Sequence, residues 1–265
     1  MSLYEDKVKL AVNGKTGVCV GLDPVLTKLP MSIQGLDEPF FEFNRRIIEA
    51  TSAYASAYKP NLAFYEVLGA DGWRQLEKTI QVIPRDKLVI ADAKRGDIGN
   101  TAVAYASAMF EKLGADAVTV NPYLGSDAVS PFVEREDKGI FLLVVTSNKG
   151  ASELQQLEAN GRSIFQHVLD MGGRLNQNRN VGFVVGATDS VSLPKVLAGA
   201  DNSPLLIPGV GAQGGDIQAL RLALKDYAGP VLVNSSRGII YASNGDDFAE
   251  TAGIETQKLF DELNN

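Results

Sequence analysis

The sequence predicts an α/β fold, a (β/α)8 barrel of the TIM-barrel type. Its apolar runs are short, rich in Val, Ile and Leu, and separated by segments with helical periodicity. This pattern is typical of a buried parallel sheet with crossover helices. Eight such runs recur about every 33 residues, which matches the repeating unit of barrels of about 250 residues. The expected strands are residues 17–22, 55–59, 88–93, 117–121, 141–146, 182–186, 204–207 and 231–234.

Each expected strand is followed by a segment with helical periodicity, which supplies the crossover helix of a parallel sheet. A further helix over 3–12 precedes the first strand, and we expect it to plug one end of the barrel. No Pro- or Ser-rich linker divides the chain, so we expect one domain over residues 1–265. The same alternation would also allow an open doubly wound sheet. The expected crossover helices are residues 40–53, 73–81, 102–113, 127–135, 163–171, 192–197, 218–225 and 248–263.

The composition is that of a globular protein, with 45% hydrophobic and 22% charged residues. No apolar signal core opens the chain, and no later stretch approaches the about 18 uninterrupted apolar residues of a membrane span. We therefore expect a cytoplasmic protein with no membrane partner. The formal net charge of −7 argues against nucleic-acid binding, which needs a basic face. An anionic ligand must then be bound by a few local cations.

The chain has one cysteine and one histidine, which excludes several kinds of active site. Cys19 lies in an apolar run, as a buried structural thiol would, and His167 lies in an expected amphipathic helix. Zinc sites with several Cys or His ligands cannot be assembled in one chain, and a Ser-His-Asp triad would need His167 to leave its helix. We expect no metal site. Carboxylates, lysines and backbone groups must supply the chemistry.

Polar side chains follow most of the expected strands at the point where each strand ends. In a barrel the active site forms at the carboxyl ends of the strands, so these residues are candidates for it. Any one of them alone could equally be a helix cap or a loop residue. The candidates are Asp23, Lys59, Asp92, Lys94, Asn121, Ser147 and Arg237.

Asp92 and Lys94 form the sharpest pair among these candidates. Side chains two apart on a strand point to the same side, about 7 Å from base to base. If Asp92 faces the barrel mouth, Lys94 should face it too. Asp97 then falls at the start of the next helix, where an acidic side chain is favoured.

A glycine-rich segment at 208–215, PGVGAQGG, follows the seventh expected strand. A dinucleotide-binding fold would place such a segment in its first strand-to-helix turn, so NAD binding is disfavoured. In barrels, the loops after strands seven and eight often bind phosphate through backbone N–H groups and a helix N-terminus. Arg237, after the eighth strand, would supply a forked cation for that phosphate.

The run DAKRGDIGNT at 92–101 resembles the D-x-K-x-x-D-I-G-N-T signature of the orotidine 5′-monophosphate decarboxylase family. Similar matches recur along most of the chain, and their longer forms resemble the bacterial subgroup, type 2. The wider superfamily of ribulose-phosphate-type decarboxylases and aldolases shares only D-x-K-x-x-D, so residues 98–101 favour the decarboxylase family. The further matching segments are GLDP at 21–24, KPN at 59–61, TVNPYLG at 119–125, PGVGAQGG at 208–215 and NSSRGI at 234–239.

The resemblance implies decarboxylation of orotidine 5′-monophosphate (OMP) to uridine 5′-monophosphate (UMP) and CO2, the last step of UMP synthesis, without metal or organic cofactor. It assigns Lys94 as the group that stabilises the carbanion at C6 and then donates a proton to it. Asp92 would hold Lys94, and Lys59 would belong to the same charged array. Asp97 would complete the site of a partner subunit in a homodimer.

The resemblance also implies a set of substrate-binding residues. Asp23 would bind the ribose hydroxyls, Ser147 the pyrimidine, and Gln213 and Arg237 the phosphate. Thr101 would act with Asp97 across the dimer interface. The remaining expected substrate-binding residues are Ile98, Asn121 and Pro208.

Two other functions are alternatives, although the residues support each of them less well. A sugar-phosphate aldolase or decarboxylase on this barrel would normally need a metal, and a nucleotide-binding barrel could keep the pocket without turnover.

Segments 149–162 and 209–217 are candidates for a closing lid, and their possible hinges are Gly150, Gly161 and Gly214.

Overall fold

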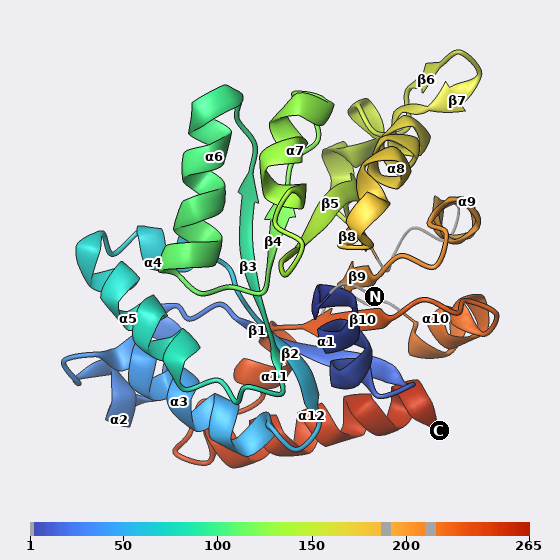
Figure 1. Cartoon of the computed structure of the whole chain (residues 1–265). Coiled ribbons are helices and arrows are strands. Elements are labelled where there is room, and N and C mark those ends of the chain that lie inside the picture. Colours follow the sequence, from blue (N-terminus) through green and yellow to red (C-terminus); the bar gives the residue numbers. More distant parts are fainter. Residues whose placement is uncertain (1–2, 187–191, 210–215) are drawn as a thin grey trace.

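Eight parallel strands close into a barrel in the computed structural model, which describes residues 3–186, 192–209 and 216–265 (Figure 1). Their order around the barrel is β1-β10-β9-β8-β5-β4-β3-β2, so consecutive barrel strands lie side by side and the last pairs with the first. This closure excludes the open doubly wound sheet. The strands are β1 (Thr16–Leu22), β2 (Ala55–Pro60), β3 (Leu88–Arg95), β4 (Ala117–Val120), β5 (Gly139–Val145), β8 (Val181–Val185), β9 (Leu205–Pro208) and β10 (Val231–Ser235).

The predicted barrel is confirmed, and every predicted strand agrees with an observed strand to within two residues at each end. Each crossover contains one of the predicted helices, although α8 extends four residues beyond its predicted end at 171 and α5 begins three residues before its predicted start at 73. The predicted helix over 102–113 is α6 followed by a π-helical segment, η2. The main helices are α1 (Leu3–Val12), α3 (Pro39–Thr51), α5 (Ala70–Gln81), α6 (Gly99–Ser107), η2 (Ala108–Lys112), α7 (Ser126–Val133), α8 (Ile164–Leu175), α9 (Ser192–Gly199), α10 (Ile217–Leu224) and α12 (Phe248–Asn264).

Several short elements lie in the loops and were not predicted. Most are single helical turns, whose few residues show no apolar periodicity. A two-stranded antiparallel hairpin, β6–β7, overlaps the end of the first lid candidate, 149–162. The short elements are η1 (Leu26–Lys28), α2 (Met31–Gln34), α4 (Ala63–Glu66), η3 (Lys149–Glu153), β6 (Glu158–Ala159), β7 (Arg162–Ser163), η4 (Asn176–Asn178) and α11 (Arg237–Ile240).

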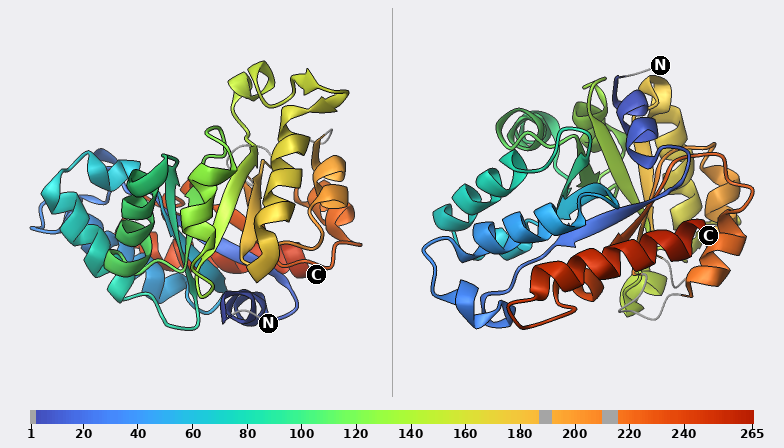
Figure 2. Two further views of the ribbon diagram at one scale, coloured as in Figure 1. Left: turned by 45° about the horizontal axis from the view of Figure 1, so that its top comes forward. Right: turned by 90° about the horizontal axis from the view of Figure 1, so that it is seen from below.

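Helix α1 closes the amino-terminal end of the barrel, as predicted. Tyr4, Val8 and Val12 are buried and pack with the inward-facing side chains of the strands, including Ile90 and Phe141. In the left view of Figure 2, α1 and the β6–β7 hairpin lie at opposite ends of the molecule. The interior is therefore a packed core plugged at its amino-terminal end, and in this fold the active site forms at the opposite end, where the strands end.

A second, larger core lies between the barrel and the helices around it. The aromatic rings of Phe43 and Phe248 stack 5.0 Å apart where α3 packs against α12, the helix that runs along the barrel beside it (Figures 1 and 2). None of the helices within the described ranges is long and apolar enough to cross a membrane.

Candidate active site

Two adjoining cavities open at the carboxyl ends of the strands. One has a volume of about 460 Å³ and reaches from β1 to α11, and the other has a volume of about 380 Å³ and lies over β3, β4 and β5. Both are lined by Lys59, Asp92, Ser147 and Pro208, so the four residues stand at the junction between them. Together the cavities form one elongated site with the charged residues near its middle.

Asp92 stands at the centre of a three-residue charged array. Its Oδ2 atom lies 2.8 Å from Nζ of Lys59, and its Oδ1 atom lies 2.6 Å from Nζ of Lys94. Asp92 and Lys59 are buried, whereas half of the Lys94 side chain is exposed. The predicted proximity of Asp92 and Lys94 is confirmed, and the array presents one of its two ammonium groups to the opening.

The surroundings of Asp92 keep it ionised. Burial alone raises the pKa of this carboxyl group, but the charges of Lys59 and Lys94 and their hydrogen bonds outweigh burial and hold the pKa well below its usual value. For Lys59, burial lowers the pKa, and the neighbouring carboxylates of Asp92 and Asp23 raise it above its usual value. The buried pair is therefore charged on both sides at neutral pH.

The backbone brings Lys94 to this position by a route that the sequence did not predict. Ala91 pairs with Val118 and Arg95 pairs with Val120, so three residues of β3 stand opposite one residue of β4, Thr119. Lys94 lies within this irregularity and has a left-handed backbone, with φ of 47°. The two-residue repeat of a regular strand does not hold there, and the ion pair depends on the bulge.

Thr119 is a residue of the site that sequence reasoning missed. Its side chain is buried, and its Oγ1 atom lies 3.0 Å from Oδ1 of Asp92 and 2.9 Å from the backbone nitrogen of Lys94. The available signal was a polar residue at an inward position in the apolar run Ala-Val-Thr-Val at 117–120.

The larger cavity is lined by several polar groups that could bind a polar ligand. Asp23, Asn234 and Ser236 line it, and each has a buried oxygen atom without a hydrogen-bond partner in the described part of the chain. Arg237 begins α11 at the rim of the same cavity, and its side chain is exposed. Buried oxygen atoms in this state are normally satisfied by a ligand or by water.

Tyr241 fixes the loop that carries Asp23. Its hydroxyl group donates to the carbonyl oxygen of Asp23 at 3.0 Å and accepts from the backbone nitrogen of Val25 at 2.7 Å. This tyrosine, after α11, is separated from Asp23 by 218 residues, and sequence reasoning missed it too. It holds the end of β1 against the segment that contains Arg237.

Some predicted site residues do not line either cavity of their own chain. Asp97 accepts a hydrogen bond from the backbone nitrogen of Ile98 at 2.8 Å, and Ile98 and Thr101 are exposed on the first turn of α6 or just before it. Asn121 is also exposed, and its side chain accepts from the backbone nitrogen of Tyr123 at 3.0 Å. These four residues stay predictions.

The lid candidates are only partly described. Gln213 and Gly214 lie outside the described residues, as does most of the segment 209–217. Within 149–162, Gly161 has φ of 73° at the turn of the β6–β7 hairpin. The segment 149–162 also contains η3 and the strand β6, and it ends at the first residue of β7.

Cys19 and His167 have the structural roles expected from the sequence. Burial raises the pKa of the Cys19 thiol to about 12, so it is not a thiolate at neutral pH. His167 lies on α8, and its Nε2 atom is 2.8 Å from the carbonyl oxygen of Ala159. Within the described ranges, no group of three or more His, Cys, Asp or Glu side chains is arranged to hold a metal ion.

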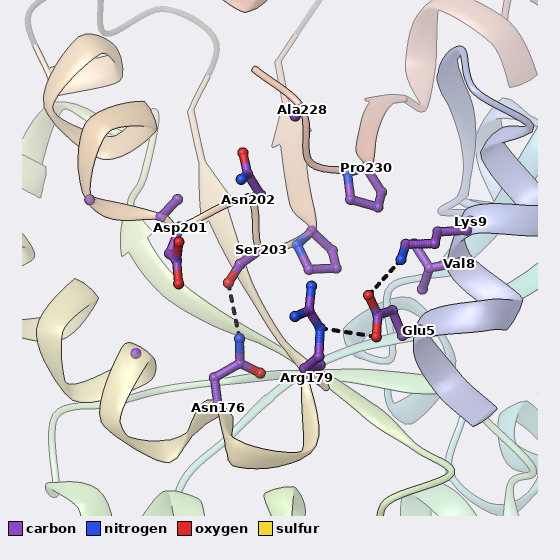
Figure 3. Close-up of a pocket in the computed structure, with 14 residues that line it drawn as sticks. Glu5, Val8, Lys9, Asn176, Arg179, Asp201, Asn202, Ser203, Ala228 and Pro230 are labelled. Carbon is purple, nitrogen blue, oxygen red and sulfur yellow. Dashed lines mark hydrogen bonds and ion pairs between the residues drawn. The ribbon is translucent and has the colours of Figure 1, made fainter. Parts of the chain in front are cut away.

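A further cavity of about 430 Å³ lies at the opposite, amino-terminal end of the barrel (Figure 3). Glu5 of α1 forms ion pairs there with Lys9 at 2.6 Å and with Arg179 at 3.0 Å, and Asn176 donates to Ser203. These side chains join α1 to the loops after α8 and α9. In a barrel, polar contacts at this end serve stability, and the chemistry takes place at the other end.

The comparisons with known proteins agree with this fold and show the family of the chain. The family model described as "Orotidine 5'-phosphate decarboxylase / HUMPS family" matches residues 16–252. The orotidine 5′-phosphate decarboxylase of Dehalococcoides mccartyi strain CBDB1 is 44% identical over 271 residues, which cover 99% of this chain and 97% of that protein. That of Haloarcula marismortui is 48% identical over 261 residues, 93% of each chain. The structure of Leishmania donovani OMP decarboxylase is 38% identical and superposes with a TM-score of 0.81 over 98% of this chain and 99% of that chain. The chain therefore belongs to the orotidine 5′-phosphate decarboxylase / HUMPS family.

Proposed function

We propose that the protein catalyses the decarboxylation of OMP to UMP and CO2, with Lys94 as the residue that stabilises the reacting carbon and protonates it. The observation that carries this proposal is the ion pair of 2.6 Å between Lys94 and Asp92 in a cavity that continues to Arg237. A nucleoside monophosphate has its reacting ring and its phosphate at opposite ends, as this elongated site requires. The curated relatives compared above are named as decarboxylases of this substrate.

The chemical problem is the negative charge that develops at C6 of the pyrimidine. When the bond between C6 and the carboxylate breaks, its electron pair stays on C6 and CO2 leaves. No neighbouring atom of the ring accepts this pair. Charged groups already in place must therefore lower the activation free energy by stabilising the transition state. The ammonium group of Lys94 supplies a positive charge and then a proton, which forms the new C–H bond of UMP. The neutral amine left on Lys94 regains its proton from water.

Asp92 and Lys59 prepare Lys94 for this step. The carboxylate of Asp92 holds the Lys94 ammonium at 2.6 Å, and Lys59 neutralises the buried carboxylate from the other side at 2.8 Å. With both oxygens of Asp92 bonded, the carboxylate has little freedom to turn. A fixed charge needs no reorganisation as the transition state forms, which is the advantage of a preorganised site.

We assign the other end of the substrate to the larger cavity. Asp23 would bind the ribose hydroxyl groups, and Arg237 with Gln213 would bind the phosphate. Ser147 and Pro208 line both cavities and would contact the pyrimidine. Phosphate binding far from the reacting carbon would supply energy that is used at that carbon. No part of this assignment calls for a metal or an organic cofactor.

We also propose a homodimer in which Asp97, Ile98 and Thr101 complete the site of the partner subunit. The surface around these residues is partly apolar. Ile98 is 58% exposed, and Tyr123 is 74% exposed. The segment that follows β3, with Asp97 and Ile98, lies beside the segment that follows β4, with Tyr123. The backbone nitrogen of Asn121 donates to the carbonyl oxygen of Arg95 and joins the two segments. An apolar surface of this kind around charged residues is typical of a protein interface.

Four further assignments complete the proposal, of which only the subgroup follows from the resemblance. We infer that the chain is a single catalytic domain of the bacterial type 2 subgroup, that it works in the cytoplasm and that nucleic acid is not a partner. The net charge of −7 supports the last of these inferences.

The test is an assay of the purified protein with OMP. We expect the absorbance of OMP to fall while UMP and CO2 form in equal amounts, with the same rate in the presence of a chelator. A rate that depends on added metal would favour a sugar-phosphate enzyme of the same superfamily. Binding of UMP without turnover of OMP would indicate a nucleotide-binding barrel and would contradict the proposal.

A further inference from the structure

We propose that Thr119 is a positioning residue of this site, which holds the Asp92 carboxylate and the Lys94 backbone in register through one hydroxyl group. The proposal deepens the proposed function and rests on it, because its significance depends on Lys94 being the proton donor. Thr119 is only 2% exposed, so it acts through its neighbours rather than on the substrate.

The position of Thr119 in the sheet explains why one side chain reaches both residues. Ala91 and Arg95 of β3 pair with Val118 and Val120 of β4, and Thr119 alone stands opposite the three residues between them. In a regular ladder the nitrogen of Lys94 would donate to a backbone carbonyl of the neighbouring strand. Here it donates to Oγ1 of Thr119 at 2.9 Å instead. The hydroxyl group replaces the missing partner in the bulge.

The direction of the two hydrogen bonds follows from the atoms involved. A backbone N–H can only donate, so the Thr119 oxygen accepts from Lys94. The single hydroxyl proton is then available to Oδ1 of Asp92, 3.0 Å away, and an ionised carboxylate can only accept. Thr119 therefore matches the charged state of Asp92. A protonated Asp92 would offer a second donor and would fit this arrangement less well.

Both bonds act on groups that would otherwise move. Lys94 has φ of 47°, a conformation that is unfavourable for a residue with a side chain, and the bond to Thr119 helps to hold it. Oδ1 of Asp92 receives Lys94 and Thr119 from two strands, while Oδ2 receives Lys59 from a third. The carboxylate is thus fixed from β2, β3 and β4. Loss of the hydroxyl group would therefore leave both the Asp92 carboxylate and the Lys94 side chain less firmly positioned.

The test compares variants of nearly equal size. Thr119→Val removes the hydroxyl group and keeps the shape, and Thr119→Ser keeps the hydroxyl group. Thr256→Val is the matched control, because Thr256 is also fully buried but donates to the carbonyl oxygen of Ala252 in its own helix, α12. We expect kcat of Thr119→Val to fall by about 10- to 100-fold, as for the loss of one hydrogen bond to a charged group, while KM changes by less than about threefold. Thr119→Ser should recover kcat to within about threefold of the wild type, and Thr256→Val should keep it.

A second measurement does not depend on activity. Hydrogen exchange of the Lys94 amide, measured by NMR, should accelerate in Thr119→Val and stay slow in Thr119→Ser and Thr256→Val. If the wild type did not turn over OMP, the proposed function would fail and the exchange experiment would still decide the role of Thr119. Wild-type kcat and slow exchange in Thr119→Val would overturn the inference. If Thr119→Val does not fold, the pair Thr119→Ala and Thr119→Ser makes the same comparison.

Discussion

The side chains of Lys94 and Asp92 share an ion pair of 2.6 Å although one is half-exposed and the other is only 10% exposed. The carboxylate lies beneath the ammonium group and is held from below by Lys59, which is 6% exposed. Both lysines line the smaller cavity, and Lys94 is the more exposed of the two. The buried lysine holds the carboxylate, and the carboxylate in turn holds the exposed lysine. The site therefore has a positive group whose position is fixed from beneath.

Arg237→Ala should mainly weaken substrate binding. Arg237 stands at the rim of the larger cavity, far along the site from Lys94, so its loss should raise KM and change kcat less. A charged hydrogen bond is worth about 1.5–3 kcal/mol, which corresponds to an increase in KM of roughly 10- to 100-fold. Steady-state kinetics with OMP measures this. Arg174→Ala, in the last turn of α8, is the control and should keep the wild-type KM; an equal KM in both variants would remove Arg237 from the phosphate site.

Mixing two inactive variants should restore activity if Asp97 works across the dimer interface. In a mixed dimer of Lys94→Ala and Asp97→Asn, one site carries both changes and the other carries neither. Random exchange of subunits should therefore restore about a quarter of the wild-type activity. Lys94→Ala mixed with Asp92→Asn is the control, because both residues belong to the same chain's site and no intact site can form. Recovery in the control, or none in the test mixture, would count against a shared site.

The stability contributed by Asp92 should depend on pH. The pKa of Asp92 is lower in the folded protein than in the unfolded chain, so its contribution is complete above the ordinary aspartate pKa of about 3.9. It is lost as the pH falls toward the lower folded value. At pH 7, Asp92→Asn should lower the free energy of unfolding by about 3–5 kcal/mol, the cost of leaving a buried partner unpaired.

Denaturant unfolding between pH 7 and pH 3 measures this dependence. The difference between wild type and Asp92→Asn should be largest at pH 7 and should narrow below about pH 4. Asp226→Asn is the control, because the side chain of Asp226 is 87% exposed. A difference for Asp92→Asn that stays constant with pH would show that the folded and unfolded states bind protons alike there.

The barrel could be predicted from the sequence because its strands are buried on both faces. Such strands read as short apolar runs, and the polar residues at their ends mark the side of the barrel where a site forms. Lys59 and Asp92 were found in this way, and both line the junction of the two cavities.

The parts that could not be predicted depend on how distant segments pair. The left-handed backbone of Lys94 and the role of Thr119 follow from a register shift between β3 and β4, which no local pattern encodes. Tyr241 reaches Asp23 only because the barrel closes β1 against β10. In each case the decisive partner lies on another strand or after the last one.

The most direct test of this account is the single-turnover rate of OMP decarboxylation by Lys94→Ala. General acid catalysis contributes about 10²- to 10⁴-fold and a fixed charge adds to it, so we expect the rate to fall by at least about 10⁴-fold. UMP binding and the unfolding temperature should stay close to those of the wild type. Lys225→Ala, an exposed lysine after α10, should keep the full rate. A Lys94→Ala rate within about tenfold of the wild type would contradict the assignment of Lys94 as the proton donor.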